Sequence, residues 1–370
     1  MTAVPFGDLK AHVAALRPEI DAAVARVLDS GWFILGPEGE SFERELAAAL
    51  DARHAVAVAS GTEAIQLALE ALGLAAGDEV ITSPLTAAFT ALAIVRAGAR
   101  PVFADVDPVT LNVSPESLEG AITPHTRALL PVHLYGHPVD LDPMLELARR
   151  RGIPLVEDAC QAIGARYKGR PVGALSGIGA LSFYPTKNLG AFGDGGAVVV
   201  DDPEVAARLR RLRNGGQSDR YHHEVVGINS RLDEMQAALL RAKLGHLAAW
   251  TDRRRALAAR YHEGLAGGGV EVPVEQPYAR AVYHLYVIRH PRRDALAAAL
   301  KERGIGTLVH YPIPLHLQPA FAELGRRRGD FPVAERAAGE ILSIPLFPEM
   351  TDGQAEAVIR AIREVAPGLR

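Results

Sequence analysis

Short apolar segments alternate with amphipathic helical patterns between about residue 55 and residue 200, and this alternation limits the possible folds more than any other feature of the chain. After the strand-like segment 55–59, apolar side chains recur at helical spacing at Ile65, Ala68, Leu69 and Leu72. Further strand-like segments, separated by helical stretches such as 141–150, follow at 79–82, 100–104, 128–132 and 153–156. This alternation predicts an α/β fold with helices on both faces of a mainly parallel sheet.

The pattern changes after residue 178. The apolar segments 178–184 and 196–200 lie too close together for a helical crossover, and the run 193–196 is rich in turn formers. We therefore predict an antiparallel pair of strands here. Further on, Ser230 precedes a periodic apolar run, which predicts a long helix that starts there and continues past Trp250.

The pattern of the C-terminal third of the sequence predicts a second, smaller α/β domain. Three glycines at 267–269 interrupt the helical region, and the segments after them are a strand at 281–289, a helix at 294–303 and a proline-rich stretch at 311–319. We expect a large domain at 1–249, with an N-terminal segment that can pack on the small domain at 250–370.

Composition excludes several classes of protein. The chain has 370 residues, 40 Lys plus Arg and 44 Asp plus Glu, so its net charge of −4 gives no overall attraction to nucleic acid or to an anionic membrane. A single cysteine, Cys160, cannot form an internal disulfide, which is typical of a reducing compartment and makes the cytoplasm the expected location. No export signal and no apolar run of about 18 residues are present, so we expect no membrane partner.

Three short elements carry residue types suited to chemistry. Ser60, Gly61 and Thr62 lie where a strand gives way to a helix, so their N–H groups could hold a phosphate, although alone they read as an ordinary helix N-cap. Asp158 follows a strand, at the sheet edge where α/β proteins bind ligands, or it caps a loop. Lys187 lies in a loop, where a lone lysine is usually solvated.

Together the three elements suit pyridoxal phosphate. The N–H groups fix the phosphate, the amine of Lys187 forms a Schiff base with the aldehyde, and Asp158 keeps the ring nitrogen protonated so that the ring accepts electrons. The combination is far more specific than any of its parts and predicts an enzyme that uses this cofactor.

At this point the chain resembles the sugar aminotransferases of the DegT/DnrJ/EryC1/StrS type, which are fold-type-I pyridoxal phosphate enzymes. The resemblance covers nearly the whole length and rests on five ordered motifs: GWFILGP at 31–37, SGTEA at 60–64, EDACQA at 157–162, SFYPTKNLG at 182–190 and HYPIPLH at 310–316. It implies a large domain with a mainly parallel seven-stranded sheet flanked by helices, and a smaller C-terminal α/β domain.

The resemblance also implies roles for residues. Lys187 would be the Schiff-base lysine, Asp158 would lie at the pyridinium nitrogen and Gln161 beside the ring hydroxyl. The phosphate contacts that it implies are Gly61, Thr62 and Ser182, completed by Asn229 from the neighbouring subunit. The resemblance therefore predicts a homodimer with active sites at the subunit interface.

One position departs from the family. Many members carry an aromatic residue, stacked on the pyridine ring, where this chain has Ala87. Phe89 lies two residues further and would point from another face of a helix, so the stacking role is not transferred to it. Ala87 remains a candidate contact to the ring.

The residues around the lysine resemble the branch that acts on 3-keto sugars, because Tyr184 replaces the histidine of the 4-keto branch and the run GDGG follows at 193–196. Tyr184, His310 and Tyr311 are therefore candidate contacts to the sugar, and Arg220 to the diphosphate. The spacing of the histidines, including His133, predicts no metal site.

These features predict an aminotransferase that moves an amino group from L-glutamate, through pyridoxamine phosphate, to a keto nucleotide-sugar, for which a 3-keto-6-deoxyhexose linked to dTDP or a similar nucleotide is expected. The alternatives are a 4-keto nucleotide-sugar or an inosose as acceptor, or a non-catalytic pyridoxal phosphate-binding sensor. A sensor would be expected to lose the lysine, so the presence of Lys187, Asp158 and Asn229 favours an enzyme.

Overall fold

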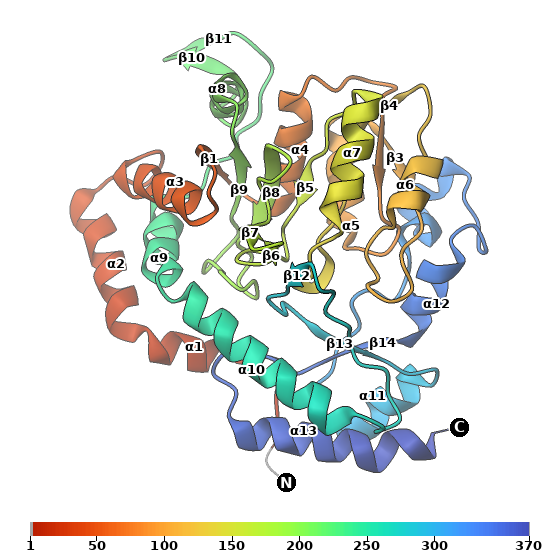
Figure 1. The fold of residues 1–370 in the computed structure, drawn as a ribbon. Coiled ribbons are helices and arrows are strands. Elements are labelled where there is room, and N and C mark those ends of the chain that lie inside the picture. The colour runs from red at the N-terminus through yellow and green to blue at the C-terminus, as the bar shows by residue number, and fades with distance from the viewer. Residues whose placement is uncertain (1–2, 370) are drawn as a thin grey trace.

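A seven-stranded sheet lies at the centre of the larger part of the molecule, within the residues 3–369 that the computed structural model describes (Figure 1). Its strands are β1 (His54–Val58), β2 (Glu79–Thr82), β3 (Arg100–Phe103), β4 (Thr126–Leu129), β5 (Glu157–Asp158), β8 (Ile178–Ser182) and β9 (Gly196–Val200). They are ordered β3-β2-β4-β5-β8-β9-β1, and single parallel bridges from Leu129 to Leu155 and from Val132 to Asp158 join β4 to β5. Only β9 runs against the others, which confirms both the mainly parallel sheet and the antiparallel β8–β9 pair.

The strands are apolar because both faces of the sheet are buried. In β1, Ala55 and Ala57 belong to one hydrophobic cluster, whereas Val56 and Val58 belong to the cluster on the opposite face. Side chains alternate between the two faces of a strand, so a strand that is covered on both sides reads as a continuous apolar run. This is why the sequence shows apolar runs rather than alternation of apolar and polar residues.

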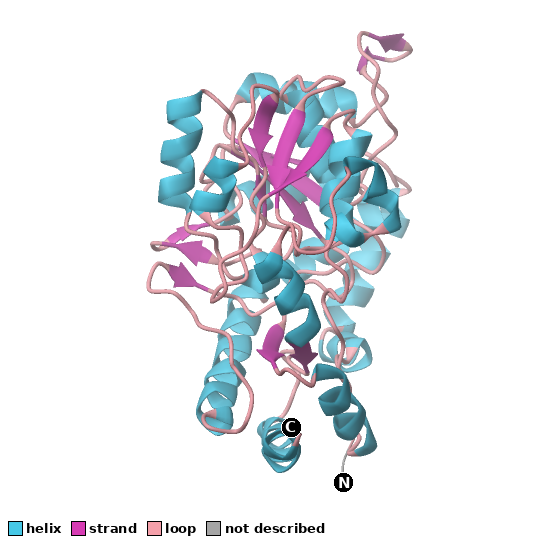
Figure 2. Cartoon of the chain, turned by 90° about the vertical axis from the view of Figure 1, so that its right-hand side faces the viewer, coloured by secondary structure: helices cyan, strands magenta, loops and turns pink. Residues whose placement is uncertain are grey.

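Helices cover both faces of the sheet (Figures 1 and 2). The first cluster is built with α3 (Pro37–Ala49), α6 (Pro115–Gly120), α7 (Leu141–Arg151) and α9 (Glu234–Leu244). The second cluster is built with α4 (Gly61–Ala71), α5 (Ala88–Arg96) and α8 (Pro203–Leu212). The predicted three-layer α/β arrangement is confirmed.

The C-terminal part has a core of its own. Its elements are α10 (Leu247–Leu265), β13 (Tyr286–Arg289), α11 (Arg293–Glu302), α12 (Pro332–Glu340), β14 (Ile341–Ile344) and α13 (Asp352–Val365), with β13 and β14 antiparallel. Val4 belongs to the hydrophobic cluster of this part and pairs with Ile305. The boundary expected after residue 249 falls inside α10, and the division into two domains stays a prediction.

The remaining helices and strands lie around these cores, and Tyr167 among them is buried in the first cluster. They are α1 (Leu9–Ala15), α2 (Arg17–Ser30), the small sheet β12 (Ala279–Arg280), β6 (Arg166–Tyr167) and β7 (Arg170–Pro171), and the hairpin β10 (Gln217–Asp219) and β11 (His222–His223). Figure 2 shows this hairpin projecting away from the body of the molecule.

Two expectations about helices and strands are wrong in detail. The helix expected from Ser230 begins at Glu234, because the Ser230 hydroxyl instead accepts the N–H of Ala59 and donates to Glu63 at the start of α4. It also ends before Trp250, since Gly245 and His246 separate α9 from α10. The strand expected at 281–289 is shorter, Tyr286–Arg289.

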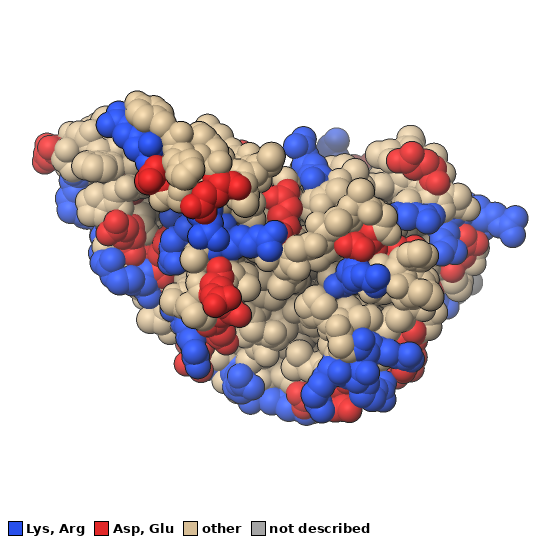
Figure 3. All heavy atoms as spheres, turned by 90° about the horizontal axis from the view of Figure 1, so that it is seen from above, with Lys and Arg blue, Asp and Glu red and all other residues tan. Residues whose placement is uncertain are grey.

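Charged residues of both signs are mixed over the face shown in Figure 3. Within residues 3–369, no helix combines the length and the apolar character needed to cross a bilayer.

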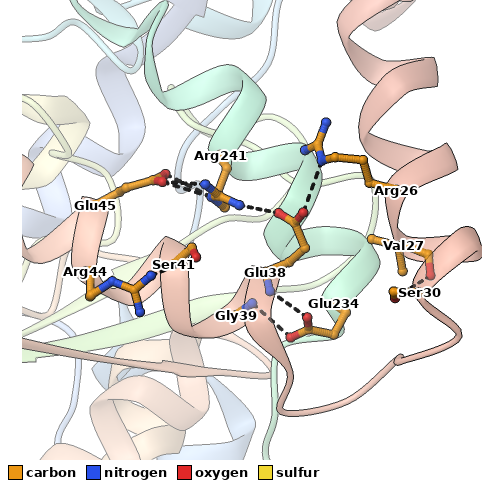
Figure 4. Close-up of polar contacts among 10 residues, drawn as sticks. All are labelled: Arg26, Val27, Ser30, Glu38, Gly39, Ser41, Arg44, Glu45, Glu234 and Arg241. Atoms are coloured by element: carbon orange, nitrogen blue, oxygen red, sulfur yellow. Dashed lines mark hydrogen bonds and ion pairs between the residues drawn. The ribbon is translucent and has the colours of Figure 1, made fainter.

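Glu234 ties α9 to the beginning of α3. The start of α3 has no capping side chain of its own, because its N-cap is Gly36. The fully buried carboxylate of Glu234 instead accepts the N–H of Gly36 at 2.9 Å. It also accepts the N–H groups of Glu38 at 2.8 Å and Gly39 at 2.9 Å (Figure 4). Pro37 at the first helical position has no N–H, so one carboxylate satisfies the first turn of the helix.

We predict that Glu234→Ala lowers the free energy of unfolding by about 2–3 kcal/mol, because it leaves buried N–H groups without an acceptor. Glu45→Ala is the control, since Glu45 lies partly exposed beside Arg241 and its loss is expected to cost about 1 kcal/mol or less. Denaturant unfolding at fixed protein and cofactor concentration measures both. Equal stabilities of the two variants would contradict the capping role.

Candidate active site

A cleft of about 1120 Å³ opens at the carboxyl ends of the parallel strands. Its walls come from the sheet, from the N-terminal segment and from the C-terminal part of the chain. Open α/β sheets bind ligands at this edge. The cleft brings together ten of the twelve residues predicted for the site, which are Gly61, Thr62, Ala87, Asp158, Gln161, Ser182, Tyr184, Lys187, His310 and Tyr311.

Asp158 is fixed by its place in the sheet. Its backbone N–H bonds to Pro131 and its carbonyl accepts the N–H of His133, both on the chain that follows β4. The carboxylate is 2% exposed; its Oδ2 accepts the hydroxyl of Thr90 at 2.8 Å, and its Oδ1 accepts the N–H of Cys160 at 3.2 Å. The carboxylate therefore lines the cleft in one orientation, with room for a further donor on Oδ1.

Lys187 lies in the tight loop between β8 and β9, where its N–H donates to the carbonyl of Tyr184 at 2.8 Å. A Cβ at Gly190 would lie 2.3 Å from the carbonyl oxygen of Pro185, so the loop requires glycine at that position. Burial is the main cause that lowers the pKa of the Lys187 amine, and the nearby Cys160 and Asp158 oppose this effect in part. The neutral fraction of the amine is therefore larger than that of a lysine in water.

The start of α4 forms a cradle of backbone N–H groups. Ser60 caps the helix by accepting the N–H of Glu63 at 3.2 Å, and Gly61 and Thr62 are the first helical residues, whose N–H groups have no acceptor within the helix. A Cβ at Gly61 would lie 2.6 Å from the Cβ of Ser182. Only glycine therefore allows α4 and the end of β8 to approach so closely.

The far wall of the cleft is a network of neutral polar groups. Gln161 Oε1 accepts the N–H of Tyr135 at 2.8 Å, which leaves its Nε2 to donate to the hydroxyl of Tyr311 at 3.2 Å. Burial raises the pKa of Tyr311 to about 12 and lowers that of His310, which lies next to it, to about 4. Both side chains are therefore uncharged at neutral pH.

Ala87, which stands where many family members have an aromatic residue, and the nearby Phe89 both line the cleft. Ala87 is the N-cap of α5 rather than part of the helix, and it lines the cleft. Phe89, which is 61% exposed, also lines it, as does Tyr184 at 53%. A single chain thus presents exposed aromatic surface beside Ala87.

Asn229 and Arg220 are the two predicted residues that do not line the cleft of a single chain. Asn229 is exposed and bridges to Asn214 at the base of the projecting hairpin. Arg220 lies at the turn of that hairpin, with its guanidinium 5.1 Å from the ring centre of Tyr221. Their predicted roles remain predictions.

Sequence reasoning missed the residues that support Asp158. Glu157 points to the other side of β5, where it is fully buried and accepts the imidazole of His133 at 3.1 Å and the N–H groups of Gly173 and Ser176 at 2.8 Å each. His133 Nδ1 accepts the N–H of Val139, so the proton donated to Glu157 lies on Nε2. Two consecutive acids after an apolar run were the available signal, since strand neighbours face opposite sides.

These residues fit pyridoxal phosphate. The unpaired first N–H groups of α4 suit a phosphate, the amine of Lys187 with its lowered pKa suits an aldehyde, and Asp158 Oδ1 can accept a hydrogen bond from a protonated ring nitrogen. Within residues 3–369, no group of three or more His, Cys, Asp and Glu side chains is arranged to hold a metal.

The profile of the DegT/DnrJ/EryC1/StrS aminotransferase family matches residues 14–363. The chain is 55% identical over 364 residues to the dTDP-3-amino-3,4,6-trideoxy-alpha-D-glucose transaminase of Streptomyces venezuelae, which covers 98% of this chain and 96% of that protein. It is 45% identical over 367 residues to the UDP-N-acetyl-3-dehydro-alpha-D-glucosamine 3-aminotransferase of Acidithiobacillus ferrooxidans, which covers 99% of each.

Among solved structures, the chain is similar to DesV of Streptomyces venezuelae, described in complex with a ketimine intermediate. The TM-score is 0.97 and the sequence identity 54%, with 99% of each chain covered. The chain therefore belongs to the DegT/DnrJ/EryC1/StrS aminotransferase family and is an aminotransferase of the predicted pyridoxal phosphate-dependent type.

Proposed function

We propose that this enzyme moves an amino group from L-glutamate to the 3-keto group of a nucleotide-linked 6-deoxyhexose, with dTDP as the expected nucleotide. The observation that carries the proposal is the meeting of Lys187, Asp158 and the N–H cradle of α4 in one cleft. The names of the two relatives support the position on the sugar, because both refer to an amino group at carbon 3.

Pyridoxal phosphate, when bound, supplies an electron sink for the electron pair that remains when the donor loses its α-proton. Lys187 moves that proton: its neutral amine takes it from the α-carbon of the donor and delivers it on the cofactor side, and the same amine works in reverse toward the sugar. A buried amine with a lowered pKa holds more of its neutral form at neutral pH, which suits this role.

Asp158 acts through charge. Its carboxylate would hold a proton on the ring nitrogen of the bound cofactor, and the hydroxyl of Thr90, which donates to it, keeps it oriented. Asp158 is buried, and the interaction between its carboxylate and a protonated nitrogen would therefore be stronger than it would be in solution.

Tyr184, His310 and Tyr311 line the cleft, and we assign them to the sugar. The hydroxyl of Tyr311 stays protonated and His310 stays neutral above about pH 5, since their pKa values are about 12 and about 4. They offer uncharged hydrogen-bonding groups to a ketone and its hydroxyl neighbours.

We also propose that a second copy of the chain completes the site. Arg220 lies at the turn of a hairpin that extends away from the body of its own chain, and Asn229 lies at the base of that hairpin, so a neighbouring cleft is the place where they can meet the diphosphate and the phosphate (Figure 2). The single cysteine suits a homodimer that works in the cytoplasm.

Lys187→Ala is expected to reduce turnover by about four orders of magnitude or more, because it removes the amine to which we assign the proton transfer. Pyridoxamine phosphate should still bind, since the cradle and Asp158 remain. Lys168→Ala is the control, as Lys168 pairs with Asp142 on the surface. Steady-state rates and a cofactor-binding titration test this; normal turnover by Lys187→Ala would overturn the mechanism.

The choice of acceptor is tested with the enzyme in its pyridoxamine phosphate form. We expect a dTDP-linked 3-keto-6-deoxyhexose to react at least about 100-fold more efficiently, in kcat/KM, than the 4-keto isomer or an inosose, because the cleft selects by where it places hydrogen-bonding groups. Product formation followed by mass spectrometry measures each. A preference for the 4-keto sugar or for the inosose would show that the proposed acceptor is wrong.

The shared site is tested by mixing two inactive variants. Asn229→Asp places a negative charge where we expect the phosphate, and Lys187→Ala removes the amine. If each site takes Asn229 from the partner, reassociated hybrid dimers contain one intact site in two, and an equal mixture should recover about a quarter of wild-type activity. No recovery after verified subunit exchange would contradict a site shared in this way.

A further inference from the structure

We infer that Lys243 and Arg254 form an anion subsite in the inner part of the cleft, and that it receives a carboxylate of the dicarboxylic amino donor. This inference rests on the proposed function, because it names how the donor is recognised. Both residues line the same cleft as Lys187. They come from the two helices, α9 and α10, that connect the sheet to the C-terminal core.

Both cations are withdrawn from water. Lys243 is 2% exposed and Arg254 is 6% exposed. Burial is the main cause that lowers the pKa of Lys243 to about 8 and that of Arg254 to about 10. Burying a charge without a partner costs free energy, so two such cations in one cleft call for an anion.

The protein supplies little negative charge to these cations. Glu349 is the one carboxylate among the described residues that raises the pKa of either of them, and its Oε1 is already bonded to His12 Nδ1 at 2.6 Å. Two buried cations thus share one carboxylate that has another partner. An added carboxylate would balance the charge.

Both cations also have hydrogen bonds left to donate. Lys243 Nζ donates to the carbonyl of Gly190, which uses one of its three protons. Arg254 Nη1 donates to the carbonyls of Leu346 at 2.9 Å and Tyr283 at 3.2 Å, whereas its buried Nε has no partner among the described residues. The backbone contacts hold the guanidinium in place and leave part of it unsatisfied.

The two cations lie close to the reacting lysine. Gly190, the partner of Lys243, is in the same tight loop as Lys187. Arg254 and Lys187 also share a neighbour, the buried imidazole of His284, because the positive charges of both help to lower the pKa of His284. Nδ1 of His284 contacts Asn188 Oδ1 at 3.2 Å. A donor that presents its amine at Lys187 can therefore place a carboxylate beside these cations.

The burial of both cations also selects the size of the ligand. A sugar diphosphate is attached to a nucleoside and needs an open path, whereas more than nine-tenths of each cation is covered by protein. A single carboxylate on a short carbon chain can enter such a space. L-Glutamate has that shape, and L-glutamine is its uncharged counterpart.

The test compares the two donors in the same enzyme preparation. With the holoenzyme, conversion of bound cofactor is followed by absorbance, and kcat/KM is measured for L-glutamate and for L-glutamine in the wild type and in Arg254→Gln, which keeps an amide donor for the backbone carbonyls. We expect the wild type to prefer glutamate and the variant to lose about 10- to 100-fold of that preference, since one charge-assisted hydrogen bond is removed.

The neighbouring residue on α10 provides the control. Arg255 bonds to Glu275 and to the carbonyl of Ala281 and does not line the cleft, so Arg255→Gln should leave the ratio unchanged. Lys243→Met is a second variant and should shift the ratio in the same direction as Arg254→Gln. The ratio isolates recognition of the carboxylate, because a loosened loop would slow both donors alike.

The possible results distinguish a failure of the proposed subsite from a failure of the proposed function. An unchanged ratio in both Arg254→Gln and Lys243→Met would overturn the subsite, as would a wild type that does not distinguish glutamate from glutamine. A rise in KM for the nucleotide-sugar with the donor ratio intact would also overturn it, because the cations would then serve the acceptor. If no amino donor changes the absorbance of the wild-type enzyme, the proposed function itself fails.

Discussion

The active site depends on one structural constraint: the carboxylate of Asp158 and the amine of Lys187 must be held near each other where water is scarce. The sheet provides this through β5 and β8, which are parallel neighbours with Asp158 opposite Ala180. The chain leaves β8 after Ser182, two residues beyond that partner, and enters the loop that carries Lys187. The switch to the antiparallel β9 then returns the chain through the sheet, so the loop stays at the same edge as Asp158.

Burial lowers the pKa of Lys187 and so increases the neutral fraction of its amine, which can then accept a proton. The side chain of Asp158 is held by hydrogen bonds from Thr90 and Cys160, which replace part of the water that it loses on burial. Close contacts that allow no side chain, as at Gly61 and Gly190, bring the surrounding backbone near enough to shape the cleft.

Much of this could be predicted from the sequence. Apolar runs buried on both faces predict a parallel sheet, and an acid placed after such a run, as Asp158 is, falls at the binding edge whatever the tertiary details. The start of the helix near Ser230 could not be predicted, because the Ser230 hydroxyl is bonded to Glu63, a residue 167 positions away in sequence. Local patterns do not encode such contacts.

The same reason explains the residues that sequence reasoning missed. Thr90 supports Asp158 only once α5 lies beside β5, and Lys243 and Arg254 reach the cleft only because α9 and α10 cross its inner end. In the sequence alone, Thr90, Lys243 and Arg254 are single polar residues within helical patterns, and such residues are usually interpreted as exposed surface positions. The roles of Asn229 and Arg220 depend on a second chain, so neither the sequence pattern nor one chain's geometry fixes them.

The most direct test of the central claim is the absorbance spectrum of the purified protein with pyridoxal phosphate, recorded before and after L-glutamate is added. We predict a visible band from cofactor bound at Lys187, which glutamate replaces with a near-ultraviolet band as the amino group is transferred. The absence of a visible band, or a band that no amino donor changes, would contradict the assignment of Lys187 and Asp158 to this chemistry.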